Sequence, residues 1–158
     1  MIFLTLGTQL PFDRLVRAVD EVAADIDESV FGQIGHTKLV PQAYDYVDFL
    51  PPQEFGARFS AARVIVGHAG IGTILSGRKA EKPLILMARR ASLGEHRNDH
   101  QMRTVEQLGR IPGVHVAENA EDIRRYLSNS ELQAMRADTS PALERFHAAI
   151  KSEIFVTT

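Results

Sequence analysis

The stretch RVIVGHAGIGTILSGRKAEK, residues 63–82, decides the fold of this chain. The β-branched run at 64–66 is typical of a strand buried on both faces, and the apolar run stops at Gly67. Small residues then continue to Gly72, after which positions 73–80 can run as a helix. The pattern therefore predicts a strand, a glycine-rich turn and a helix.

The turn after this strand is expected to bind an anion. The first backbone N–H groups of a helix lack partners inside the helix and point, with the positive end of the helix dipole, beyond the edge of the sheet. A phosphate or diphosphate is the commonest occupant of such a position. Gly70 and Gly72 would let an anion approach the main chain closely. Alternatively, these glycines only permit a tight turn from strand to helix.

Two stronger phosphate-binding motifs are absent from the sequence. The dinucleotide-binding pattern needs a glycine three places after Gly72, where Leu75 stands, and no acidic residue follows a second strand at the required distance. The Gly-Lys-Ser/Thr of the P-loop occurs nowhere. A nucleotide-dependent oxidoreductase is therefore disfavoured.

Length and composition suit one globular domain. The chain has 158 residues with 44% hydrophobic content, and positions 130–158 are expected to form a C-terminal helix and tail. Cysteine is absent, which excludes disulfides and thiolate chemistry and suits a cytoplasmic protein. The first ten residues contain too few apolar side chains for a signal peptide or a membrane span, so we expect a soluble chain.

The net charge of -2 conceals an uneven distribution. Positions 78–110 hold eight Lys or Arg against four Asp or Glu, whereas the remainder holds ten against sixteen. A basic region beside the predicted anion turn favours a negatively charged ligand, although solvated helix faces would give the same count. Nucleic acid is not expected, because no aromatic residues are interleaved with the basic ones and no binding motif is present.

Apolar strands alternate with amphipathic helices along the chain, which is typical of a parallel sheet covered on both faces. Strands are predicted at 2–6, 30–35, 46–50, 64–66, 83–87 and 113–116. Helices are predicted at 11–26, at 53–62, at 73–80, around 105–108, at 122–127 and at 132–150. The predicted fold class is α/β, a single Rossmann-like, doubly wound parallel sheet. In such sheets, ligands bind outside the carboxyl ends of the strands.

Polar loops follow several predicted strands and are expected to meet at one edge of the sheet. Thr8, His36, the turn at 68–73 and the loop at 95–101 lie at successive strand ends. The loop at 95–101 offers donors and acceptors that suit sugar hydroxyls, or it has no role beyond being polar. Its two histidines stand four apart, but no third ligand has suitable spacing, so no metal is predicted. No catalytic triad or carboxylate pair can be assigned.

Six segments, in the order of the chain, carry a resemblance to a known family. They are MIFLTLGTQLPFDRLVRAVDE at the start, QIGH at 33–36, DFLPPQEF at 48–55, HAGIGT at 68–73, KPLILM at 82–87 and GEHRNDHQ at 94–101. Together they resemble the glycosyltransferase family 28 C-terminal domain, above all the short bacterial exopolysaccharide (glucuronosyl)transferase catalytic subunits that contain only this half. The chain is also similar to the catalytic subunit of the eukaryotic two-part transferase that adds the second GlcNAc to dolichol-linked GlcNAc.

The resemblance implies the GT-B architecture, in which the C-terminal half binds a nucleotide sugar, usually a UDP-sugar, and the N-terminal half binds the acceptor. This chain would be the donor-binding half, made as a separate catalytic subunit of an inverting transferase that needs no cofactor. A membrane-associated partner subunit would supply the acceptor site and the general base, and would recruit the chain to the inner face of the membrane. A homo-oligomer stays open.

The resemblance also implies roles for individual residues. The backbone of Leu50 would meet the uracil, and Thr8 and His36 would line the same cleft. The donor sugar would be contacted by Asp99, His100 and Gln101. The diphosphate would be held by the turn formed by His68, Ala69, Gly70, Ile71, Gly72 and Thr73. The catalytic residues, which stabilise the charge that develops on the leaving diphosphate, would be His68 and Arg97.

The donor sugar is predicted partly from the resemblance and partly from charge. UDP-glucuronate is favoured because guanidinium groups suit a sugar carboxylate, and the chain offers Arg89, Arg90, Arg97 and Arg103. UDP-GlcNAc, UDP-glucose and UDP-galactose stay open. Many relatives hold the ribose with a glutamate three residues after the threonine of the turn, where this chain has Ser76. A non-catalytic nucleotide-binding or scaffolding module is the alternative function.

Overall fold

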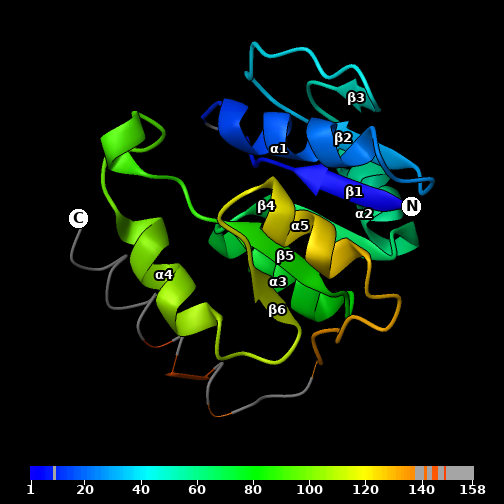
Figure 1. Cartoon of the computed structure of the whole chain (residues 1–158). Coiled ribbons are helices and arrows are strands. Elements are labelled where there is room, and N and C mark those ends of the chain that lie inside the picture. Colours follow the sequence, from blue (N-terminus) through cyan, green and yellow to red (C-terminus); the bar gives the residue numbers. More distant parts are fainter. Residues whose placement is uncertain (9, 138–140, 142–143, 146–147, 149–158) are drawn as a thin grey trace.

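The fold is built on a six-stranded parallel sheet with the strand order β3-β2-β1-β4-β5-β6. It is seen in a computed structural model that describes residues 1–8, 10–137, 141, 144, 145 and 148, without the side chains at 100, 101 and 104. The strands are β1 (Ile2–Thr5), β2 (Val30–Gln33), β3 (Asp45–Val47), β4 (Val64–His68), β5 (Leu84–Met87) and β6 (Val114–Val116). β3 and β6 form the two edges of the sheet (Figure 1).

Helices cover both faces of this sheet (Figure 1). They are α1 (Asp13–Ala23), α2 (Pro52–Ala61), α3 (Ile71–Lys79), α4 (His100–Leu108) and α5 (Ala120–Leu127), with a short 3-10 turn η1 (Ala91–Leu93). One core lies under α1 and α5, and the other lies under α2, α3 and the end of α4. Successive strand residues alternate between the two cores: Leu4 belongs to the first and Phe3 to the second. The central strands are therefore apolar throughout.

The chain order produces a switch point beside the central strand. From β1 the chain runs outward through β2 to β3, and then returns to place β4 against the other side of β1. At the carboxyl ends of these two neighbouring strands, the connection after β1 therefore leads to β2 on one side, and the connection after β4 leads to β5 on the other side. A crevice at such a point is the usual ligand site of an open α/β sheet. The predicted α/β, doubly wound parallel sheet is confirmed.

The six predicted strands are all present, but some boundaries differ. The third strand was expected at 46–50 and is observed at Asp45–Val47. The Asp48 carbonyl still accepts the N–H of Gly35 at 2.9 Å, but two residues further on the N–H of Leu50 donates to the Gln33 side chain and not to a strand backbone. The third predicted helix begins at Ile71 rather than at position 73, so Gly72 lies inside its first turn.

The predicted helix at 132–150 is wrong over residues 132–137, which are not helical. The backbone N–H of Met135 donates to the Lys82 carbonyl at 3.2 Å, and its side chain is 2% exposed in the second core. Gly113 lies directly beneath, and a Cβ there would overlap the backbone of Met135. This packing holds the segment away from a helical path. Residues 141, 144, 145 and 148 are helical, and the rest of the predicted helix and tail lies outside the described residues.

We predict that Gly77→Ala destabilises the chain, because Gly77 packs α3 against β5. A Cβ at this position would lie 2.5 Å from Cδ2 of Leu84, which is fully buried and cannot move aside. Such overpacking costs about 1 to 3 kcal/mol. Gly56→Ala in α2 is the matched control, because its Cβ would meet nothing within 4 Å. There the gain in helix propensity should stabilise by about 0.5 to 1 kcal/mol. Urea unfolding of both variants tests this, and equal shifts would contradict it.

Candidate functional site

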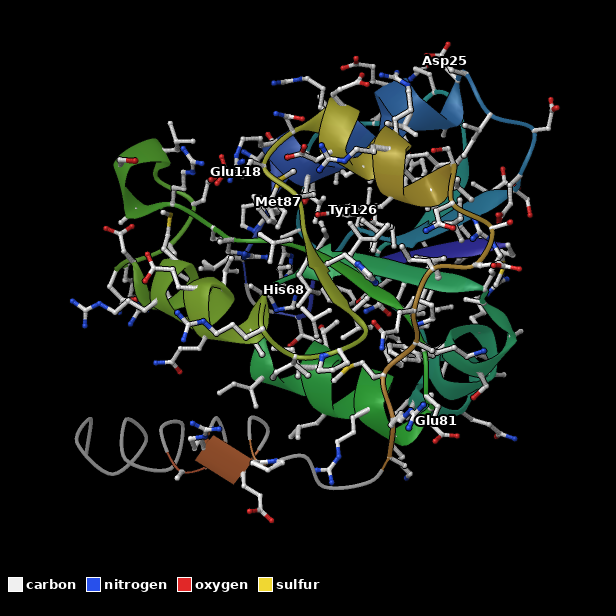
Figure 2. All side chains as sticks on the ribbon, turned by 60° about the horizontal axis from the view of Figure 1, so that its bottom comes forward. Asp25, His68, Glu81, Met87, Glu118 and Tyr126 are labelled. Atoms are coloured by element: carbon white, nitrogen blue, oxygen red, sulfur yellow. The ribbon has the colours of Figure 1, made fainter. Side chains whose placement is uncertain are left out.

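A cavity of about 530 Å³ opens at the carboxyl ends of the central strands, where the switch point was located. Its walls come from the loops after β1, β3, β4 and β5, from the end of β2 and from the first turns of α2 and α3. His68 and Met87 are paired at the ends of the neighbouring strands β4 and β5 (Figure 2). The crevice that the fold predicts is thus a cavity large enough for a small-molecule ligand.

The first turn of α3 forms one wall of this cavity. The residue before the helix is Gly70, with φ -97° and ψ 148°, and no side chain caps the helix there. The N–H of Ile74 donates to the Gly70 carbonyl at 3.3 Å, so the N–H groups of residues 71–73 precede the intrahelical ladder. A Cβ on Gly72 would meet no atom within 4 Å. The unpaired N–H groups therefore face an open, anion-favouring space.

The His68 ring is held in a slot between two glycines. A Cβ on Gly7, whose φ is +73°, would lie 2.8 Å from Cε1 of His68. A Cβ on Gly70 would overlap Nε2 of the same ring. Both loops can therefore close around the imidazole only because neither carries a side chain. Nδ1 of His68 is buried without a hydrogen-bond partner of ordinary geometry, although the Thr5 backbone is close enough to act on its charge.

Two titratable groups with shifted pKa values line the cavity together. Burial and, to a lesser degree, the positive charge of Arg89 lower the pKa of His68 to about 4, while the Thr5 backbone opposes the shift. Burial also lowers the pKa of Arg89 to about 10, with Glu95 opposing. At neutral pH the cavity therefore contains a neutral imidazole and a guanidinium cation.

Arg89 is positioned by main-chain acceptors. Its side chain is 2% exposed, and Nη2 donates to the carbonyls of Leu6 and Leu10 at 2.9 Å each. The guanidinium lies 5.0 Å from the centroid of the Phe12 ring. The cation is thus fixed beneath the loop that follows β1, instead of extending freely into solvent.

An ion pair between α1 and the loop after β5 holds the part of the cavity wall that contains His96. Nε of Arg14 donates to both carboxylate oxygens of Glu95 at 3.2 and 3.1 Å, and Nη2 donates to the Ala88 carbonyl at 2.8 Å. Glu95 also accepts the backbone N–H of Arg90 at 3.1 Å. These contacts pin the loop to α1, and the next residue, His96, lines the cavity.

The wall opposite α3 is more apolar and is built around a buried glutamine. Phe49, Leu50, Pro52 and Phe55 line this end together with Gln33, the last residue of β2. Gln33 is 4% exposed, and its Oε1 accepts the N–H of Leu50 at 2.8 Å. The cavity therefore has a polar, cationic end at α3 and an aromatic end at the start of α2.

The predicted site residues fall into three groups. Those that line the cavity are Thr8, Leu50, His68, Gly70, Ile71, Gly72 and Thr73. Those outside its lining are His36, Ala69, Arg97 and Asp99. His100 and Gln101 begin α4, and their side chains lie outside the described residues.

The residues outside the lining have other contacts. His36 is exposed and meets the Phe49 ring edge-on at 5.2 Å. Ala69 is buried in the second core, and its N–H donates to the Met87 carbonyl. Asp99 accepts the N–H of Ala91 at 3.0 Å, and Arg97 is exposed.

Of the four arginines that were predicted to meet a sugar carboxylate, one lines the cavity. Arg89 lines the cavity, whereas Arg90 pairs with Glu118 at 3.7 Å and the exposed Arg97 and Arg103 do not line it. Within the described part of the chain, no three His, Asp or Glu side chains gather closely enough to hold a metal ion.

Several lining residues were not expected from the sequence. They are Thr5, Leu6, Gly7, Leu10, Gln33, Phe49, Pro52 and Phe55, whereas His96 belongs to the loop at 95–101 that was expected there. Gln33 carries a visible signal, since it is the one strongly polar residue of an otherwise apolar strand. Gly7 also carries a signal, because it lies just after the first strand, in the way that Gly70 lies just after the fourth. The other residues become recognisable only once the loops have been placed in space.

The fold is that of the C-terminal half of a GT-B glycosyltransferase. The chain matches the glycosyltransferase family 28 C-terminal domain over residues 1–153 and belongs to that family. A comparison with curated proteins finds no match. Among described residues, no helix is long and apolar enough to cross a membrane.

Solved structures with the same fold include a protein of nearly the same length. The NMR structure of ALG13 has a TM-score of 0.58 and 18% identity, with 91% of this chain and 92% of that chain covered. MurG from Acinetobacter baumannii has a TM-score of 0.60 and 16% identity over 83% of this chain. The glycosyltransferase VinC, solved in complex with dTDP, has a TM-score of 0.50 and 20% identity over 96% of this chain.

The chain corresponds to well under half of the larger proteins. It spans 42% of the MurG chain, 36% of the VinC chain and 37% of the chain of the kitacinnamycin glycotransferase.

We predict that His68 makes the stability of the chain depend on pH. Its pKa is about 4 in the folded chain against 6.5 ordinarily, so between these values the unfolded chain binds more protons. Stability should therefore fall as the pH is lowered from 7 to 4, by about 3 kcal/mol from this group. Urea unfolding of the native chain and of His68→Gln isolates the effect, because the carboxylates titrate in both. Equal pH dependence in the two proteins would contradict it.

Proposed function

We propose that this chain is the donor-binding catalytic subunit of an inverting UDP-sugar glycosyltransferase. The observation that carries the proposal is the cavity at the switch point, with a helix N-terminus and a buried cation at one end and aromatic side chains at the other. A nucleoside diphosphate has the same polarity, because a charged diphosphate is joined to a flat, mostly apolar base. Family membership and the complex of VinC with dTDP support this reading.

The diphosphate would lie against the first turn of α3. The N–H groups of residues 71–73 would donate to its oxygens, and Gly72 leaves room for that approach. Arg89 supplies a positive charge at the same end of the cavity. The neutral His68 can donate one hydrogen bond, and a bound dianion would raise the pKa of its ring toward the charged form.

These groups would act on the bond that breaks. The acceptor hydroxyl attacks the anomeric carbon from the face opposite the diphosphate, the carbon–oxygen bond to UDP breaks, and its electron pair passes to the β-phosphate oxygen. The charge that develops there is stabilised by the α3 N-terminus and by His68 and Arg89. Arg97 lies outside the cavity lining and would reach the leaving group only if its loop moved. The proton of the acceptor would pass to a base of the partner subunit.

UDP-glucuronate is the proposed donor, with UDP-GlcNAc as the alternative. Arg89 is the guanidinium that lines the cavity, but its Nη2 already donates to two carbonyls. The glucuronate proposal therefore rests on the positive charge that Arg89 places at the cavity wall. Ser76 lines the cavity at the position where many relatives have a glutamate that holds the ribose. Its side chain is shorter than a glutamate, but its hydroxyl can still form a hydrogen bond with a ribose hydroxyl.

A partner subunit is part of the proposal. The described fold is the donor-binding half of a GT-B enzyme, and we propose that the acceptor binds to a separate, membrane-associated chain that recruits this one from the cytoplasm to the inner face of the membrane. Exopolysaccharide or lipid-linked glycan synthesis would be the setting. Binding of UDP without turnover by any such complex would favour the alternative of a non-catalytic nucleotide-binding module.

We predict that Gly72→Val lowers UDP affinity about tenfold to a hundredfold. The branched side chain would occupy the open space at the helix N-terminus and remove at least one charge-assisted hydrogen bond. Leu75→Val is the matched control, since Leu75 lies on the same helix, is 41% exposed and does not line the cavity. Calorimetric titration with UDP, and with ADP and NAD for comparison, measures the effect. Unchanged affinity in a folded Gly72→Val chain would remove this turn from the binding site.

We further predict that transfer requires the partner. The isolated chain should bind UDP but leave UDP-sugar intact in the presence of acceptor, because the proposal places the acceptor site and the general base on the partner. Co-expression with a membrane-associated acceptor subunit should restore release of UDP, measured by a coupled assay. Full transfer by the purified chain alone would contradict this division of roles.

A further inference from the structure

We propose that Gln33 selects the base of the nucleotide, by presenting an amide N–H donor to the oxo group at C4 of a uracil or thymine ring. The inference deepens the proposed function and rests on it, because it concerns the base end of the same cavity. It assigns a specificity-determining contact to the NH₂ group of a side chain whose oxygen already holds the backbone N–H of Leu50.

The orientation of the Gln33 amide is set by its neighbour. The backbone N–H of Leu50 is a donor, so the atom that it meets at 2.8 Å must be the oxygen Oε1. The amide is therefore turned with its NH₂ group away from Leu50. The oxygen and the nitrogen of a side-chain amide have nearly the same shape, so it is the hydrogen bond from Leu50 that identifies which of them is the oxygen.

We infer that the NH₂ group faces the cavity. Gln33 is 4% exposed, and the solvent-filled space that it borders is this cavity. Among the described residues, Nε2 has no hydrogen-bond acceptor, and it is not one of the side-chain nitrogens that are sealed from solvent. A buried amide with an unused donor at the wall of a cavity favours a ligand atom that accepts a hydrogen bond.

The surroundings of Gln33 suit a flat ring. Phe49, 44% exposed, and the half-buried Phe55 line the same end of the cavity. The cationic end, with Arg89 and the first turn of α3, lies across the cavity on the loops of β4 and β5. A diphosphate bound at α3 would therefore leave its base at the aromatic end, within the space that Gln33 borders.

The donor character of Gln33 distinguishes between pyrimidines. Uracil and thymine carry an oxygen acceptor at C4, whereas cytosine carries an amino group, which is a donor and would face the Gln33 NH₂ unpaired. Leaving two donors face to face in a partly buried site typically lowers affinity about tenfold to a hundredfold. The chain should accordingly bind UDP and dTDP in preference to CDP.

Calorimetric titrations with UDP, dTDP and CDP test this inference in the native chain and in Gln33→Glu. The glutamate keeps an oxygen for the Leu50 N–H but turns an acceptor toward the base. The UDP-to-CDP affinity ratio should be about ten or more in the native chain and should fall at least tenfold in the variant. The UDP-to-dTDP ratio should stay constant, because both bases have the same oxo group. Gly72→Val serves as the control, since it should weaken UDP and CDP by the same factor.

A second measurement covers the case in which Gln33→Glu does not fold. In the ¹⁵N NMR spectrum of the native chain, the side-chain NH₂ signals of Gln33 should shift downfield when UDP is added and move much less with CDP. Binding of UDP with an unmoved Gln33 signal, or with an unchanged UDP-to-CDP ratio in a folded variant, would overturn this inference and leave the proposed function standing. Binding of neither nucleotide by the native chain would overturn both.

Discussion

The structure depends on the close contact at the ends of β1 and β4, where one imidazole fills a slot between two glycine loops. Gly7 and Gly70 cannot carry a Cβ without striking the His68 ring, so the two loops are held together by the side chain that they enclose. This contact sets where α3 begins and how its first N–H groups are aimed. The anion-favouring end of the cavity is therefore a consequence of how two central strands end.

The opposite end of the cavity depends on a second, simpler contact. The Gln33 side chain accepts the N–H of Leu50 just beyond the end of β3 and so holds the loop that places Phe49 at the cavity. At the cationic end, Arg89 is fixed by main-chain carbonyls, and the Arg14–Glu95 pair holds the loop that follows. Each wall is thus positioned by a buried polar contact at a strand end, while the apolar sheet supplies the rigid base.

The strand and helix order could be predicted from the sequence because each central strand is apolar throughout and each is followed by a turn and an amphipathic run. The glycine turn at 67–72 likewise predicted the anion-favouring end. The failures have physical causes. Residues 132–137 have helical spacing, but the backbone contacts of Met135 with Lys82 and Gly113 override it. Gln33 and Phe49 could not be placed at one cavity, because segments far apart in sequence bring them together.

A crystal structure of the chain with UDP would test the central claim most directly, namely that this cavity holds a nucleoside diphosphate in one direction. The account predicts the diphosphate against the N–H groups of residues 71–73, near His68 and Arg89, and the uracil at the aromatic end with its C4 oxygen facing Gln33. UDP bound with its base at α3, or bound outside the cavity, would contradict it.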